Sequence, residues 1–206
     1  MKKGILYSIF DWIIENVSYL NLVELFKFIG VNIFPNNRIT ALRISVDLFI
    51  VLKWLFIALV WQFNIKNGLV NIIVWYLIFT NLYTYFYYHT WTKNLNKTEF
   101  DFDRIKRRFL NLGLSIAFNV FSFAYLFAQP FFSNFKWLNE YSTLKDSVLF
   151  STANSLTTSY TYVTATTETG HTLIIIETIT SFIFLTIILS NSIPQMNTEK
   201  EDNNGI

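Results

Sequence analysis

Four apolar segments, each about twenty residues long, constrain the fold of this chain more than any other feature of its sequence. They cover residues 44–63, 69–88, 109–129 and 171–190. Twenty helical residues at ~1.5 Å each span the ~30 Å hydrocarbon core of a bilayer. Only 15% of the chain is charged, whereas a soluble domain carries about 25%. The sequence therefore predicts an all-α integral membrane protein with four transmembrane helices.

The N-terminal region is apolar as well, but polar side chains interrupt it every three or four positions. A helix that crossed the bilayer here would bury three acids and a lysine, each costing roughly 2.5–3.5 kcal/mol. The spacing puts the polar side chains on one helical face. We therefore expect residues 1–37 to form an amphipathic helix in the membrane interface, ended by Gly30 and Pro35. The polar residues are Ser8, Asp11, Glu15, Ser18, Asn21, Glu24 and Lys27.

Several function classes lack the residues that they need. The chain has no cysteine, which excludes disulfides and thiolate chemistry. Its two histidines, His89 and His171, lie at the ends of separate apolar segments. We find no nucleophile–base pair and no set of metal ligands, so we expect neither an enzyme nor a bound cofactor or metal. A net charge of +2 without a basic stripe argues against nucleic-acid binding.

The basic residues favour one orientation in the membrane. If both termini are cytoplasmic, the outer side holds only Lys66, Lys136 and Lys145. The inner side then holds Lys2, Lys3, Lys27, Arg38, Arg43, Lys93, Lys97, Arg104, Lys106, Arg107, Arg108 and Lys200. We therefore expect a multi-pass protein of the cell inner or plasma membrane with both termini cytoplasmic. Lys53 lies within the first span, where we expect a structural partner such as Asp47 or a carboxylate of another helix.

The region between the third and fourth spans has a distinctive order. Residues 146–157 are amphipathic but too short to cross the bilayer, which predicts a re-entrant helix. Asp146 begins this helix, where a carboxylate suits the helix dipole. In the third span, a polar stripe is expected to face other helices rather than lipid. The stripe consists of Asn111, Ser115, Asn119 and Ser122.

Residues 109–193 contain a series of short matches to one family. Phe150 and Ser151 occupy the short helix, Thr157-Thr158 end it, Gly170-His171 open the fourth span, and Glu177 follows within it. This order resembles the pore loop and inner helix of the tetrameric potassium-channel superfamily. The resemblance implies an outer helix, a pore helix, a filter-like loop and an inner helix, repeated in a homotetramer around a pore. Residues 38–108 would then form a two-helix hairpin with a basic linker, and 194–206 a polar tail.

The filter-like loop departs from the family where potassium selectivity is defined. Aligning Thr158 with the filter threonine places Tyr160 and Tyr162 where the family has glycines. Glycines help the backbone to reach conformations that side chains bar, so a potassium-selective carbonyl filter is not expected. Three alternatives stay open: a wider pore lined by hydroxyls, a plug of tyrosine rings, or a hydroxyl-rich extracellular turn without a pore. The lining hydroxyls would belong to Thr157, Thr158, Ser159, Thr161 and Thr164, with a ring of Glu168 attracting cations at the outer mouth.

The fourth span carries polar side chains that interrupt an Ile, Leu and Phe background. Thr178, Phe182 and Thr186 follow one another every four residues, with Ser181 beside them, and they line a cavity in the channel interpretation. Alternatively, their hydroxyls bond to the carbonyl groups of the preceding turn. Glu177 is an ionisable group within the span. We expect it to pair with the backbone of the short helix or with hydroxyls of a neighbouring loop.

These observations predict a potassium-channel-like membrane pore subunit that passes monovalent cations with weak or no K⁺ selectivity. The partners expected are the lipid bilayer, three further copies of the chain and the permeating cations. One alternative is a channel-derived subunit that does not conduct and acts by assembly with partners. Another is a small proton-coupled transporter that uses Glu177 as its proton carrier.

Overall fold

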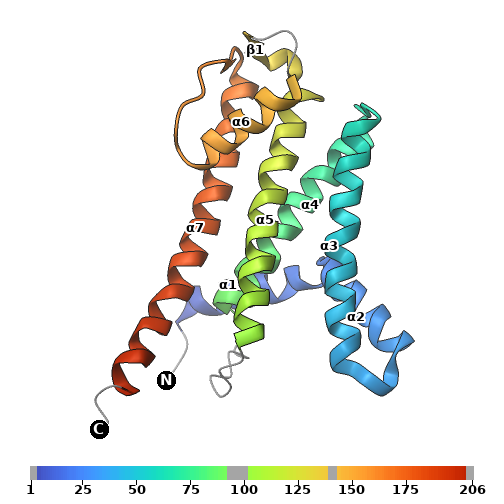
Figure 1. Ribbon diagram of the computed structural model, residues 1–206, viewed down its shortest axis with the longest axis vertical. Coiled ribbons are helices and arrows are strands. Elements are labelled where there is room, and N and C mark those ends of the chain that lie inside the picture. The colour runs from blue at the N-terminus through green and yellow to red at the C-terminus, as the bar shows by residue number, and fades with distance from the viewer. Residues whose placement is uncertain (1–3, 92–101, 139–142, 203–206) are drawn as a thin grey trace. The chain divides into compact units, whose positions relative to one another are not determined.

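The computed structural model describes residues 4–91, 102–138 and 143–202 (Figure 1). It is mainly helical, and four of the described helices are long and apolar enough to cross a membrane. They lie at Pro35–Gln62, Gly68–Phe86, Phe109–Ala128 and Glu168–Ile187, close to the four predicted spans. The chain divides into two compact units, residues 1–59 and 60–206.

The first unit contains two short helices before its long one. Helix α1 covers Ile5–Ser18, α2 covers Leu22–Ile33, the 3-10 turn η1 covers Pro35–Asn37, and α3 begins at Arg38 and ends at Gln62. This differs from the single N-terminal helix expected from the sequence. The break arises because Asn21 is extended and its side chain accepts a hydrogen bond from Val23 N at 3.1 Å, which starts a new helix.

Gly30 does not end a helix, contrary to our expectation, but lies inside α2. A Cβ atom at this position would lie 1.9 Å from Ser45 Oγ and 3.3 Å from Ala41 O, both on α3. The missing side chain therefore lets α2 approach α3 closely. The rings of Phe26 and Phe49 continue the contact between these helices, with centroids 5.4 Å apart.

The buried face of α3 carries one residue every four positions. Ala41, Ser45, Phe49 and Lys53 share this face, and each is at most 6% exposed. The Lys53 ammonium lies 5.9 Å from the centre of the Phe49 ring, within the range of a cation–π interaction. Asp47 is exposed on another face of the helix, so it is not placed on the stripe that contains Lys53.

The second unit contains the other three spans and a small hairpin. Its elements are α4 (Gly68–Phe86), the π-helical turn η2 (Tyr87–Trp91), α5 (Phe102–Ala128), η3 (Phe132–Asn134), β1 (Phe135–Trp137), α6 (Thr143–Ser155), β2 (Val163–Ala165) and α7 (Glu168–Asp202). Helix α7 continues past residue 190, where the span was predicted to end. Strands β1 and β2 pair antiparallel, with Lys136 opposite Thr164. This pair of strands was not expected from the sequence.

Helix α5 buries three of the four residues of its predicted polar stripe, whereas Asn111 is half-buried. Ser115, Asn119 and Ser122 are each at most 1% exposed. The Asn81 amide of α4 donates to the carbonyl oxygen of Ser115 at 3.0 Å, so a side-chain hydrogen bond joins two apolar spans. At the other end of α5, the Tyr125 hydroxyl donates to the carbonyl oxygen of Ile65 at 2.6 Å. These contacts fix α5 within the unit and thereby position the elements that follow it.

Candidate functional site

Helix α6 is the short helix predicted between the third and fourth spans. Its 13 residues correspond to a length of about 20 Å, less than the ~30 Å hydrocarbon core. The helix packs against α5 and α7 (Figure 1). Phe150 fixes its buried face, because its ring centre lies 5.2 Å from that of Phe127 and 5.8 Å from that of Phe135. Aromatic packing therefore joins α6 to α5 and to the first strand of the hairpin.

The Thr157-Thr158 pair lies where α6 ends. Thr157 has φ of 56°, in the left-handed region, which is costly for a β-branched residue. The backbone N–H of Thr158 donates to Ala153 O at 2.8 Å, and that of Thr157 donates to Asn154 O at 3.0 Å. These bonds close the helix and turn the chain back. A strained residue therefore begins the filter-like loop.

The loop returns along the helix that it follows. The hydroxyl of Tyr160 donates to Asp146 Oδ1 at 2.7 Å, which brings the loop to the first turn of α6. Two residues later, the carbonyl oxygen of Tyr162 accepts from Leu138 N at 2.9 Å, next to β1. Figure 1 shows the same path, from the far end of α6 back to the end of the unit that carries β1.

The two loop tyrosines have different surroundings. Tyr160 is half-buried, whereas Tyr162 is 48% exposed. Their ring centres lie 5.4 Å apart. Burial, together with the hydrogen bond and negative charge of Asp146, raises the pKa of Tyr160 to about 12. The phenol is therefore a neutral donor at physiological pH. The side chains of Thr157, Thr158, Ser159 and Thr161 are exposed beside them.

Glu177 connects the fourth span to the short helix. Its side chain is completely buried. One carboxyl oxygen contacts the Ser151 hydroxyl, and the other accepts from Asn154 Nδ2 at 3.1 Å. One turn further along α7, Ser181 Oγ donates to Ser155 Oγ at 3.0 Å. The partners of Glu177 are thus side chains of α6, rather than the backbone or loop hydroxyls that we expected.

The predicted Gly170-His171 pair lies in the first turn of α7. A Cβ atom on Gly170 would lie 2.7 Å from Asn134 O and 3.2 Å from Ala165 Cβ, so glycine lets the helix begin against the hairpin. Thr167 caps the helix: its hydroxyl accepts from Gly170 N at 3.2 Å and donates to Asn134 Oδ1 at 2.7 Å. Glu168, predicted at the outer mouth, is the first residue of α7 and is exposed.

The predicted lining residues of α7 do not share one environment. Phe182 is 67% exposed, and Thr186 is exposed beside it. Thr178 is half-buried, while Ser181 is buried against α6 together with Glu177. The hydroxyls of Thr178 and Thr186 each donate to a carbonyl group four residues earlier, both at 2.9 Å. Their donors are thus already used within the helix, as in the back-bonding alternative.

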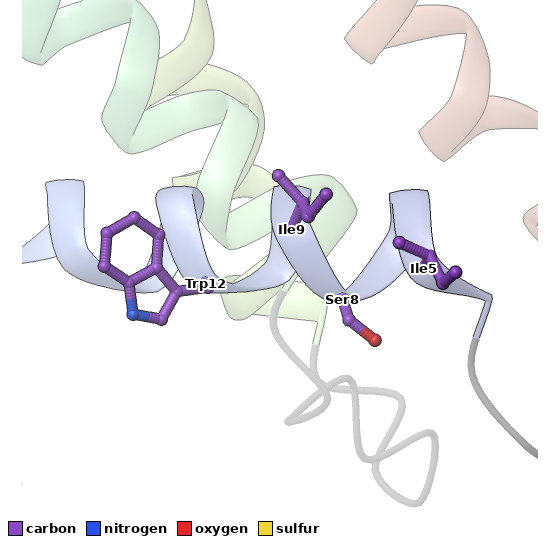
Figure 2. A pocket seen from close by; sticks show the side chains of 4 residues that line it. All are labelled: Ile5, Ser8, Ile9 and Trp12. Carbon is purple, nitrogen blue, oxygen red and sulfur yellow. The ribbon is translucent and has the colours of Figure 1, made fainter.

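A separate concave surface lies on α1 (Figure 2). It is lined by Ile5, Ser8, Ile9 and Trp12 and has a volume of about 530 Å³. The only polar side chain among these four, Ser8, donates to the carbonyl oxygen of Gly4 at 3.3 Å. This surface therefore offers apolar contacts but no acid, base or ligand set for chemistry. The described residues also contain no group of three or more His, Asp or Glu side chains arranged to hold a metal ion.

The site consequently has three parts: the α6 helix, the hydroxyl-rich loop that returns along it, and the Glu177 cluster that joins α6 to α7. Sequence reasoning identified the helix, the loop and Glu177, but not the bonds from Tyr160 to Asp146 and from Glu177 to Ser151 and Asn154. No protein-family model, curated protein or solved structure matches this chain.

Proposed function

We propose that this chain is a potassium-channel-like pore subunit that passes monovalent cations with weak or no K⁺ selectivity. The observation that carries the proposal is the path of α6 and residues 156–162. The helix is too short to cross a bilayer, and Tyr160 returns to its first turn. We take this pair as a re-entrant pore helix and loop, which enters and leaves the membrane on the same side. Irregular backbone at membrane depth is tolerated where it lines a water-filled cavity.

The exposed loop hydroxyls support weak selectivity. In a homotetramer with the loops at its axis, Thr157, Thr158, Ser159 and Thr161 would supply the polar lining. Such groups replace part of an ion's hydration shell without the ordered carbonyl rings of a potassium filter. Glu168 would form a ring of charge at the outer mouth and concentrate cations there. In this arrangement both termini are cytoplasmic, and α1 lies in the membrane interface.

The test is current recording with purified protein in planar bilayers under opposed K⁺ and Na⁺ solutions. We expect a cation current with a reversal potential near zero, and a tetramer by native mass spectrometry. Glu168→Gln should lower the current at low ionic strength and much less at high ionic strength, because salt screens the ring. Glu168→Asp keeps the charge and serves as the control. A strongly K⁺-selective current would contradict the weak selectivity, and a stable monomer in membranes would contradict the pore.

A second candidate is a channel-derived subunit that does not conduct and acts by assembly with partners. The observation that favours it is Tyr162, whose ring is 48% exposed next to the loop hydroxyls. Four such rings at an axis would block it. A tetramer without current, which conducts once Tyr162 is replaced by alanine, would establish this candidate. The transporter alternative fits less well, because Glu177 is completely buried between helices and a carrier must reach water.

A further inference from the structure

The contacts of Glu177 and Ser151 can be compared with the number of protons that their side chains supply. Ser151 Oγ contacts two oxygen atoms: the carbonyl oxygen of Val120 on α5, at 2.8 Å, and Oε1 of Glu177 on α7. A serine hydroxyl has one proton, whereas a carbonyl oxygen and an ionised carboxylate can only accept. If Glu177 were ionised, one of these two contacts would have no proton between its oxygens.

A neutral carboxyl group supplies the missing proton. Glu177 then donates through Oε1 to Ser151 Oγ, and Ser151 donates its own proton to Val120 O. The other carboxyl oxygen remains an acceptor for Asn154 Nδ2 at 3.1 Å. Each contact in this series of hydrogen bonds, which runs from α7 through α6 to α5, then contains one proton. The arrangement therefore fits the acid form of the side chain.

The charges around Glu177 lead to the same conclusion. Its hydrogen-bond partners, Ser151, Asn154 and Ser155, are neutral. An ionised carboxylate in this completely buried position would need a cation or several donors to replace water. The packed elements offer few charged groups. On α6 they are Lys145 and Asp146, in the first turn, and Asp146 accepts from Tyr160.

The remaining titratable groups of these elements lie at helix ends or are phenols. On α7, Glu168 and His171 are in the first turn and exposed, and the last four residues are Glu199, Lys200, Glu201 and Asp202. The charged residues of α5 all lie in its first seven positions, and Tyr125 is the only titratable residue from Phe109 to the end of the helix. These charged residues are Asp103, Arg104, Lys106, Arg107 and Arg108. Strand β2 has no titratable side chain. Helix α4 contributes only Tyr76, Tyr83 and Tyr85, and η2 contributes Tyr87, Tyr88 and His89.

We infer that Glu177 is a proton-binding site, and that its carboxylic acid links α7 through Ser151 to the Val120 carbonyl group of α5. The bound proton is part of the fold rather than a transported species, because the side chain is completely buried. The inference depends on the packing of three helices in one chain. It therefore stands or falls separately from the proposed pore.

Infrared spectroscopy of the protein in lipid vesicles tests the inference. We expect the wild-type minus Glu177→Gln difference spectrum at neutral pH to contain the C=O stretch of a protonated carboxylic acid. In Ser151→Ala, that band should move to higher frequency, because the acid loses its acceptor. The matched control is Glu168→Gln, which replaces an exposed glutamate of the same helix and should remove only carboxylate bands. Carboxylate bands in the Glu177→Gln difference spectrum would overturn the inference.

A measurement on the wild type covers the case in which a variant does not fold. Glutamate labelled with ¹³C at the side-chain carboxyl should give one resonance with the chemical shift of the acid form at neutral pH. Finding every glutamate resonance at the carboxylate position would overturn the inference. Neither spectrum requires the chain to conduct or to form a tetramer. The absence of current would count against the pore alone.

Discussion

The hydroxyl of Tyr160 donates to Asp146 Oδ1 at 2.7 Å, so a residue in the loop after α6 is bonded to the first turn of that helix. Asp146 is only 2% exposed. The bond turns α6 and its loop into one hairpin. It also holds the Tyr160 phenol close to α6. This position counts against the alternative in which the rings of both Tyr160 and Tyr162 fill a pore axis.

Replacing Tyr160 by phenylalanine removes a donor from a buried carboxylate. We expect Tyr160→Phe to lower the free energy of unfolding by about 1–3 kcal/mol, because a buried acceptor loses a partner. The measurement is thermal unfolding in lipid nanodiscs. Tyr162→Phe is the matched control, since Tyr162 is 48% exposed and ends the same loop. Equal losses in the two variants would show that the bond to Asp146 contributes nothing.

The same bond predicts a dependence on alkaline pH. Burial, followed by the bond and charge of Asp146, raises the pKa of Tyr160 to about 12, from about 10 in an unfolded chain. A phenol with a raised pKa stabilises the fold in its neutral form. This contribution is complete below about pH 10 and is lost as the pH rises through about 12.

Unfolding temperatures recorded from neutral to strongly alkaline pH check this expectation. The difference between wild type and Tyr160→Phe should stay constant up to about pH 10 and shrink toward pH 12. Ultraviolet titration of tyrosinate should show one late-ionising group that Tyr160→Phe removes and Tyr162→Phe does not. A difference in unfolding temperature that grows with rising pH would contradict the assigned direction of the pKa shift.

The strained turn after α6 should be relieved by glycine. Thr157 has φ of 56°, which costs roughly 1–2 kcal/mol for a residue with a Cβ atom. Replacing Thr157 by glycine would remove this cost, but part of the gain in stability is offset by the greater chain entropy of glycine in the unfolded state. We therefore expect Thr157→Gly to stabilise the protein by about 0.5–1 kcal/mol in thermal or denaturant unfolding. Ser159→Gly, in the same loop at ordinary φ, should be neutral or destabilising; a similar gain there would refute the strain.

The close approach at the start of α7 predicts opposite effects at two glycines. In Gly170→Ala, the new Cβ would lie 2.7 Å from Asn134 O, and we expect a loss of about 1–3 kcal/mol in stability. In Gly113→Ala, nothing lies within 4 Å of the new Cβ on α5. That helix should gain about 0.5–1 kcal/mol. Unfolding of both variants in the same lipid measures the contrast, and a destabilised Gly113→Ala with an unaffected Gly170→Ala would contradict the packing.

The spans were predictable because their signal is strong and local. A helix of twenty apolar residues is long enough to cross the hydrocarbon core, whatever it packs against. The second span, expected at 69–88, is α4 at Gly68–Phe86. The short α6 was equally visible, because residues 146–157 are amphipathic and too few to cross the bilayer. The buried stripe of α5 followed from the spacing of Ser115, Asn119 and Ser122.

The remaining features depend on contacts between residues that are distant in sequence. Gly30 is read as a helix breaker in isolation, but the proximity of Ser45 gives it a packing role. Glu177 meets Ser151 across 26 residues, and β1 meets β2 across a similar separation. Alternation in Phe135–Trp137 and the β-branched residues of Val163–Ala165 were weak signals for the strands. A three-residue strand is too short to stand out from a loop.

Helix α7 has consequences for movement. It extends without a break from Glu168 to Asp202, a rod of about 50 Å. Its only glycine is Gly170, in the first turn, and its only proline is Pro194, beyond the apolar window that ends at Ile187. Between them the rod has neither of the residues at which helices usually kink. A twist applied near Asp202 would be transmitted along the rod to Ser181 and Glu177, which are bonded to α6.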